Sequence, residues 1–209
     1  KNLVEWKENF PLLFPDETTD SIWISKINNP DELELFQETQ KKYNSLLHIE
    51  EELSNLFKHI KYYNPSFLAP DVITILSNID YTYRTIYTDN LLFISLDVYL
   101  GGDHPFYSDY PSYIRKNNTD ERIVVDVASN IINSTISFSN NRSFLAKMIH
   151  EGKKMYLLDL YLPSKSDPIK IGYSKDKFDW ATINEEQVWR YFIENDLLYS
   201  TDTQLNKRF

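Results

Sequence analysis

The sequence contains no cysteine, which excludes disulfide bridges, thiolate zinc sites, iron–sulfur clusters and a cysteine nucleophile among these residues. Glycine is scarce as well, with four residues in the chain. The one glycine pair, Gly101-Gly102, is not followed by Lys-Ser or Lys-Thr, so the sequence has no phosphate-binding loop of the P-loop type. The Gly-x-Ser-x-Gly turn of the α/β-hydrolases is also missing. Several large enzyme classes are therefore excluded.

Long apolar runs and an excess of positive charge are missing too. No stretch approaches the ~18 consecutive apolar residues of a membrane-spanning helix. Acidic side chains number 31 against 22 basic ones, and the formal net charge is −9. Such a chain lacks the cationic field that attracts nucleic acid, and anionic membrane surfaces repel it on average. We therefore expect no nucleic-acid partner.

The composition that remains is typical of a folded domain. Hydrophobic residues make up 42% of the chain and aromatic residues 15%, which excludes disorder as the dominant state. A length of 209 residues favours one domain over residues 1–209. The first residue is Lys1 rather than methionine, which indicates an internal or processed start. We expect any signal peptide or lipidated cysteine to lie upstream.

Helical and extended patterns alternate along the chain. Apolar residues at helical spacing predict helices starting near Asp31 and over 49–63, 120–133, 143–160 and 174–195. Apolar and β-branched runs predict strands at 72–76, 84–88 and 91–96, the last two joined by an Asp89-Asn90 hairpin, and shorter extended pieces at 21–24 and 169–171. The pattern indicates an α+β fold with a small mixed or antiparallel sheet: mainly helical over 1–69, strands over 70–100 and mainly helical over 119–209.

The predicted helix over 143–160 contains one motif that suggests catalysis. Zinc peptidases use His-Glu-x-x-His because residues four apart on a helix can bind one metal ion, while the glutamate activates the bound water. His150 and Glu151 match the first two positions, but Lys154 stands where the second histidine belongs. If the chain held zinc, His150 would be a ligand and Glu151 the general base.

Lys154 weakens this interpretation. At an effective dielectric constant near 20, an ammonium about 5–8 Å from Zn²⁺ is repelled by roughly 4–7 kcal/mol, or about three to five orders of magnitude in metal affinity. The alternative is a solvated helix face, on which Glu151 pairs with Lys147 and Lys154. We favour the solvated face and expect no cofactor, with zinc as the alternative.

Two further groups of side chains are candidates for binding. Asp97, Asp103 and His104 could surround a cation where the strands end, although turn chemistry, with Asp103 capping its own backbone, is the favoured explanation. The segment over 103–118 is rich in proline and tyrosine and predicts a loop. Its aromatic side chains could stack on sugars or hold a peptide, and the alternative is that they belong to the core. These aromatic candidates are Phe106, Tyr107, Tyr110 and Tyr113.

One long stretch matches a known family. The residues Ser95–Gly101, continuing into His104–Tyr107, resemble a hallmark stretch of the gliding motility-associated lipoprotein GldB family of Bacteroidetes. Four further blocks fit the same family in the expected order: Leu56–Tyr63, Pro111–Arg115, Met155–Asp159 and Trp189–Phe209. The resemblance covers most of the chain and is far more specific than the two-residue match at His150 and Glu151.

The resemblance implies a bacterial cell-envelope lipoprotein, anchored by an N-terminal lipidated cysteine, with a role in gliding tied to the type IX secretion machinery. Family members are similar to a domain family predicted to be zinc-dependent peptidases, which implies a zincin-like fold. On that basis His150 would match the first zinc ligand and Glu151 the general base, while Lys154 would replace the second ligand. The resemblance also implies that family chains continue past Phe209, where a third ligand could lie.

These inferences favour a zincin-like α+β domain that faces the periplasm as a non-enzymatic component of the gliding and secretion machinery. Its partners would be other proteins of that machinery. It would recognise a protein or extended peptide along the strand edge at 91–96, bordered by the loop 102–113. Two alternatives remain open: a zinc peptidase with unusual ligands, and a glycan-binding module that uses Tyr107, Tyr110 and Tyr113.

Overall fold

The computed structural model of the protein describes residues 3–14, 19–88, 90–137 and 139–205. Contacts within the chain divide it into two compact units, Lys1–Asn44 and Ser45–Phe209. Each unit is described by itself below, and the single domain over 1–209 stays a prediction. Within the described ranges, none of the helices combines the length and apolar character needed to cross a membrane.

The first unit is helical. It contains α1 (Leu3–Asn9), a 3₁₀ turn (Pro11–Leu13), α2 (Asp20–Ile27) and α3 (Pro30–Lys42). The predicted start of α3 is confirmed, because the Asn29 side chain accepts a hydrogen bond from the Asp31 amide (2.9 Å) and Pro30 occupies the first turn. The extended piece predicted at 21–24 is wrong, since these residues lie inside α2. A short apolar run does not distinguish strand from helix by periodicity, and Asp20 in the first turn and Lys26 in the last favour the helix.

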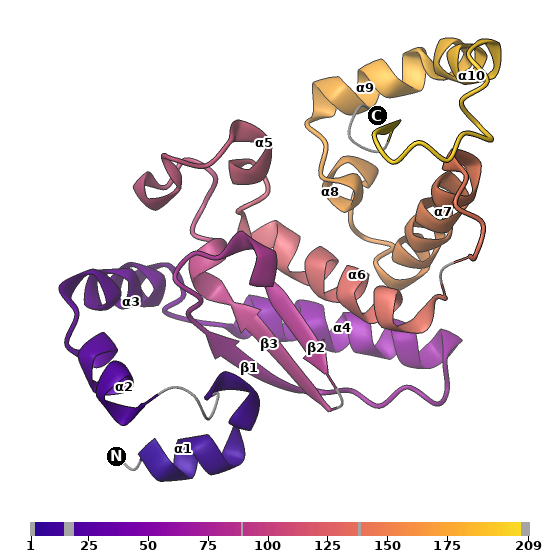
Figure 1. The fold of residues 1–209 in the computed structure, drawn as a ribbon. Helices are drawn as coiled ribbons and strands as arrows, with labels where there is room; N and C mark the ends of the chain where they lie inside the picture. Colours follow the sequence, from indigo (N-terminus) through magenta and orange to yellow (C-terminus); the bar gives the residue numbers. More distant parts are fainter. Residues whose placement is uncertain (1–2, 15–18, 89, 138, 206–209) are drawn as a thin grey trace. The chain divides into compact units, whose positions relative to one another are not determined.

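The second unit contains a three-stranded mixed sheet, which confirms the predicted α+β class and all three strands. Its strands are β1 (Asp71–Ile75), β2 (Thr85–Thr88) and β3 (Leu91–Ser95), in the order β1-β3-β2. β3 pairs in parallel with β1 and antiparallel with β2 (Figure 1). The predicted binding edge at 91–96 is therefore wrong, because β3 is the central strand and both of its edges are hydrogen-bonded. Asp89 of the predicted hairpin turn lies outside the described residues.

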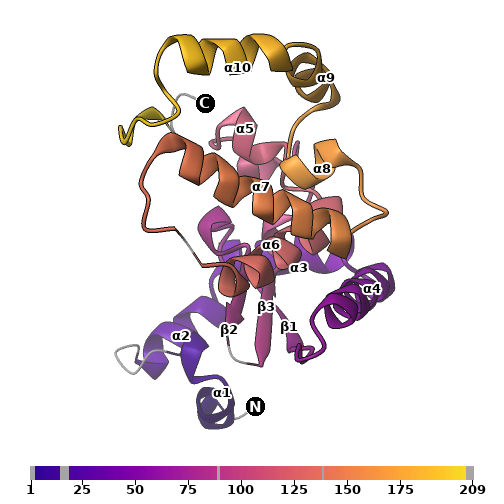
Figure 2. The ribbon, with the colours of Figure 1, turned by 90° about the vertical axis from the view of Figure 1, so that its right-hand side faces the viewer.

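Three long helices complete the core of the second unit: α4 (Leu47–Tyr63), α6 (Ile123–Thr135) and α7 (Phe144–Tyr161). α6 contacts β2, α4 and α7, and Figure 2 shows α7 lying over α6. Leu92, Phe93 and Ile94 of β3 are fully buried, so both faces of the central strand are covered. The predicted helices at 49–63, 120–133 and 143–160 are confirmed, with a 3₁₀ turn (Asp120–Arg122) leading into α6.

The remaining helices are short: α5 (Ser112–Arg115), α8 (Asp167–Ile171), α9 (Lys175–Ile183) and α10 (Glu185–Glu194), with 3₁₀ turns at Tyr81–Tyr83, Leu96–Val98 and Pro105–Tyr107. The helix predicted over 174–195 is two helices that meet at Asn184. The extended piece predicted at 169–171 is wrong, because these residues end α8. Gly172 closes that helix in the left-handed region (φ 77°) and donates to the Pro168 carbonyl (2.9 Å).

A largely buried polar cluster connects β2, α6 and the segment after β3. Asp126 accepts hydrogen bonds from the guanidinium of Arg122 (2.7 Å) and the hydroxyl of Tyr99 (3.0 Å). Arg84 lies 3.7 Å from the same carboxylate and donates to the Asn117 carbonyl (3.0 Å). Two guanidiniums thus share one carboxylate in a site mostly removed from water.

We expect Asp126→Ala to lower the free energy of unfolding by about 3–5 kcal/mol, because it leaves both guanidiniums buried without their shared counter-ion. Urea unfolding monitored by circular dichroism measures the change. Glu186→Ala is the control, since it removes an exposed partner of Arg190 and should cost less than about 1 kcal/mol. Equal losses in the two variants would contradict a structural role of the cluster.

Candidate functional site

Asp97 is a fully buried carboxylate that holds the segment after β1. Its oxygens accept hydrogen bonds from the amides of Ser77 (3.0 and 3.1 Å) and Ile79 (2.7 Å). Asn78 and Ile79 both adopt positive φ angles (58° and 55°), which is unfavourable for a β-branched residue. Burial raises the pKa of Asp97 above its ordinary value of 3.8, and the amide bonds oppose that rise. The carboxylate therefore stabilises a strained backbone segment.

The predicted aromatic side chains divide between core and surface. Tyr107 is fully buried, and its hydroxyl donates to the Asp97 carbonyl (2.6 Å) and accepts from the Leu100 amide (2.9 Å). Tyr110 stacks on Tyr107 and donates to the Ile79 carbonyl (2.7 Å). Tyr113 is 64% exposed. The structure therefore brings Asp97, Tyr107 and Tyr110 together as support for the strand ends, and a binding role for Tyr113 stays a prediction.

The residues proposed to surround a cation do not form such a site. Among the described residues, no group of three or more His, Asp or Glu side chains is placed to hold a metal ion. Asp97 bonds to the amides of Ser77 and Ile79, and Asp103 is exposed. The residue that caps the following turn is His104, whose Nδ1 accepts from the Phe106 amide (3.4 Å), rather than Asp103 as we predicted. His104 and Phe106 pack edge to face, 4.7 Å between ring centroids.

We expect Asp97→Ala to lower the free energy of unfolding by about 2–4 kcal/mol, because the amides of Ser77 and Ile79 lose their acceptor at a fully buried side chain. Asp103→Ala, at an exposed site on the next loop, is the control and should change stability by less than about 0.5 kcal/mol.

The raised pKa of Asp97 also predicts a pH dependence. The free energy of folding contributed by the protonated Asp97 side chain is fully present below pH 3.8, and it is lost as the pH rises through the raised pKa. Wild type should therefore lose stability relative to the non-titrating Asp97→Asn variant as the pH rises above 3.8. Urea unfolding of both proteins across this range measures the difference, and parallel pH profiles would contradict the assignment.

The His-Glu motif lies on α7, which begins at Ser143, whose hydroxyl accepts from the Ala146 amide (3.2 Å). The Glu151 carboxylate forms an ion pair with Lys154 (3.0 Å), as the solvated-face interpretation predicted. The Lys154 side chain is 19% exposed, and its ammonium is engaged with the carboxylate that would have to activate a zinc-bound water. The described residues around His150 and Glu151 thus do not fit a zinc ion, and no catalytic step is derived for them.

A groove that we did not predict from the sequence lies between α4 and β1. One hollow, of about 630 Å³, is formed by the second half of α4 and the residues that precede β1. A second, of about 380 Å³, is formed by the first half of α4 and by β1. Ser54 and Phe57 line both hollows, so they adjoin, and we call them together the α4–β1 groove. Its walls are Leu46, Ile49, Glu50, Leu53, Ser54, Phe57, Lys58, Lys61, Tyr62, Phe67, Leu68, Ala69, Val72, Thr74 and Ile94.

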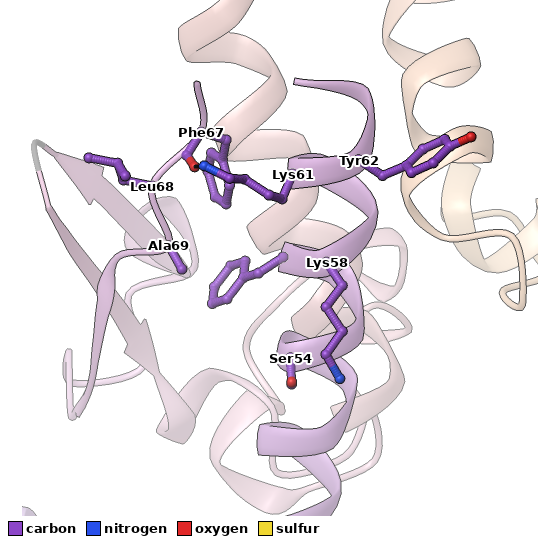
Figure 3. Close-up of a pocket in the computed structure, with 8 residues that line it drawn as sticks. Ser54, Lys58, Lys61, Tyr62, Phe67, Leu68 and Ala69 are labelled. Carbon is purple, nitrogen blue, oxygen red and sulfur yellow. Dashed lines mark hydrogen bonds between the residues drawn. The ribbon is translucent and has the colours of Figure 1, made fainter. Parts of the chain in front are cut away.

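The groove is apolar, with charged residues at its rim. Leu68 is 72% exposed and Val72 is 40% exposed, so both leave apolar surface open to solvent along the groove. Lys61 reaches from α4 to the facing segment and donates to the Phe67 carbonyl (2.7 Å), as Figure 3 shows. Lys58 lines the same hollow with its ammonium directed toward Ser54 in Figure 3, whereas Glu50 lines the second hollow. The hollow before β1 is therefore lined by two lysines, while β1 itself starts with the exposed carboxylate of Asp71.

The position of Phe57 offered one indication of the groove. Leu53, Leu56 and Ile60 form the buried stripe of α4, and Phe57 is only half-buried beside it. Leu68 stands in the short connection between α4 and β1, with Phe67 and Ala69 on either side, and has no periodic partner. Neither residue identifies a groove alone, because the partner strand lies on a separate segment of the chain.

Comparison with known proteins gives a family. A family model described as gliding motility protein GldB matches residues 1–209, which confirms the resemblance found in the sequence blocks. No curated protein and no solved structure matches the chain. The chain therefore belongs to the GldB family of gliding motility lipoproteins.

Proposed function

We propose that the protein is a non-enzymatic component of the gliding and type IX secretion machinery that works by binding another protein of that machinery. The observation that carries this proposal is the α4–β1 groove, an apolar surface beside an edge strand, where Leu68 and Val72 are exposed to solvent. Contiguous exposed apolar surface of this kind marks interaction sites. Membership of the GldB family supplies the gliding context.

The proposed location is the bacterial cell envelope, with a lipid anchor and the folded units facing the periplasm. The lipoprotein character of the family supports the anchor. The net charge of −9 supports a chain that relies on such an anchor, because its own surface is repelled by anionic lipid headgroups. A zincin-like ancestry of the fold stays a prediction.

Binding is favoured over peptidase chemistry by the residues of α7. Lys154, in place of a second histidine, pairs with the glutamate that would have to activate water. We therefore expect the full-length protein, purified without chelators, to contain zinc well below one atom per chain. Elemental analysis measures this. A stoichiometric, tightly held zinc, together with proteolysis that is lost in Glu151→Gln, would instead establish the peptidase alternative.

The glycan-binding alternative has less support. Of the three tyrosines proposed to stack on sugars, Tyr107 is buried and its hydroxyl is used within the core. Tyr110 is engaged with Ile79, which leaves Tyr113 as the fully exposed ring. One exposed ring provides a much smaller stacking surface than three.

The groove can be tested with a single charge. We expect Leu68→Glu to abolish or strongly reduce gliding in cells that carry only this variant, because it places a carboxylate on the apolar wall. Ile183→Glu on α9 is the matched control, since Ile183 is 78% exposed and does not line the groove. Colony spreading and single-cell speed measure gliding, and immunoblots confirm equal protein levels. Normal gliding with Leu68→Glu, or equal defects in both variants, would contradict the proposal.

A further inference from the structure

The two edge strands of the sheet, β2 and β1, differ in the hydrogen bonding of their outward backbone groups. On β2, the Asn130 side chain of α6 donates to the Thr85 carbonyl (2.7 Å) and lies 3.1 Å from the Thr85 hydroxyl. Arg84 directs its carbonyl to Ser95 of β3 (3.0 Å), so the next carbonyl, that of Thr85, points away from the sheet. Asn130 therefore occupies one outward-facing acceptor of this edge, and α6 packs against β2.

The edge of β1 is open. The Asp71 amide donates to the Asn90 carbonyl (2.8 Å), and backbone groups alternate in direction along a strand. Ile73 and Ile75 therefore also pair with β3, while Val72 and Thr74 direct their backbone groups outward. Among the residues that the structure describes, neither Val72 nor Thr74 has a backbone hydrogen-bond partner at this edge.

β1 has few of the devices that normally protect such an edge: Pro70 precedes it and Asp71 places one charge at its first residue, but the strand contains no lysine, proline or bulge. Natural edge strands carry lysine, proline or a bulge, or are covered by another element. The strand reads Asp-Val-Ile-Thr-Ile, pairs with β3 without interruption, and has exposed side chains at Val72 and Thr74. An unprotected edge beside an apolar groove is the arrangement that binds extended peptides by strand addition.

The charges at the groove indicate the chemistry of the added strand. Lys58 and Lys61 line the end near Leu68, and no carboxylate among the described residues forms an ion pair with either. Lys61 bonds instead to a backbone carbonyl, which leaves its charge uncompensated. An acidic side chain placed beside these lysines gains Coulomb energy, whereas Glu50 in the second hollow and Asp71 at the start of β1 repel it.

We infer that the occupant of the α4–β1 groove is an extended segment of a partner protein that joins β1 as an additional strand, with apolar side chains on alternate residues and an acidic residue beside Lys58 and Lys61. The inference rests on the proposed function, because it names the class of partner for the same surface. The backbone groups of Val72 and Thr74 supply the new ladder, and Phe57 and Leu68 contact the apolar side chains.

Proline at Val72 separates strand addition from simple groove packing. Val72→Pro removes an outward N–H that β3 does not use, and proline is tolerated on edge strands. Val72→Ala removes the side chain and keeps the N–H, so it is the matched control. Thermal unfolding of both variants confirms that the sheet remains folded.

The probe is a phage-displayed library of random linear peptides, selected on the full chain. We expect the selected peptides to alternate apolar residues and to carry an acidic residue. We expect Val72→Pro to weaken their binding about tenfold, the loss of roughly one backbone hydrogen bond, and Val72→Ala to weaken it by no more than about twofold. Lys58→Glu should weaken binding by at least as much as Val72→Pro. Hydrogen exchange should show the Val72 and Thr74 amides slowing when peptide binds, with Ile73 and Ile75 already slow without it.

Each other outcome overturns the inference. These outcomes are no enriched peptide, peptides that bind Val72→Pro as tightly as wild type, or a wild-type dimer in sedimentation that Val72→Pro dissociates, which would make a second copy the occupant. If Leu68→Glu stops gliding while Val72→Pro binds peptide normally, strand addition fails and the proposed function stands. If Val72→Pro loses peptide while Leu68→Glu cells glide normally, the proposed function fails instead.

Discussion

The carboxylate of Asp97 joins the segment after β1 to the end of β3, and the geometry of the sheet depends on that connection. By accepting the amides of Ser77 and Ile79, it holds two residues in the left-handed region at the point where β1 ends. Tyr107 and Tyr110 bond to carbonyls of the same two segments. The sequence block that identifies the family, Ser95–Gly101 with His104–Tyr107, therefore contains a structural brace for the strand ends.

Much of the fold could be predicted from local patterns, because a helix or strand is mostly specified by nearby residues. α4 and α7 carry apolar stripes longer than three turns, and the three strands are apolar runs bounded by turn residues. Short runs such as Ser21–Ile24 and Ile169–Ile171 were mistaken for strands because four or fewer residues contain no period. In both cases a flanking residue favoured helix: Asp20 in the first turn of α2 and Gly172 at the end of α8.

Strand order and the groove could not be predicted in the same way. The residues Leu91–Ser95 do not by themselves indicate that β1 pairs with β3 in parallel or that β3 is the central strand. The groove requires Phe57 of α4 and Leu68 before β1 to face each other across separate elements. The sequence did indicate that Glu151 pairs with Lys154, because an i,i+3 contact on a helix is a local property.

Asn130 limits the assemblies that the sheet can form by edge-to-edge strand pairing. A filament of identical subunits needs a head-to-tail interface, in which one surface of each copy binds a different surface of the next copy. Here Asn130 of α6 occupies an outward acceptor on the β2 side and obstructs pairing there, so a pairing between copies is favoured back to back through β1 and ends at two subunits. The free edge of β1 can therefore accept one added strand without leading to an open-ended filament of identical subunits.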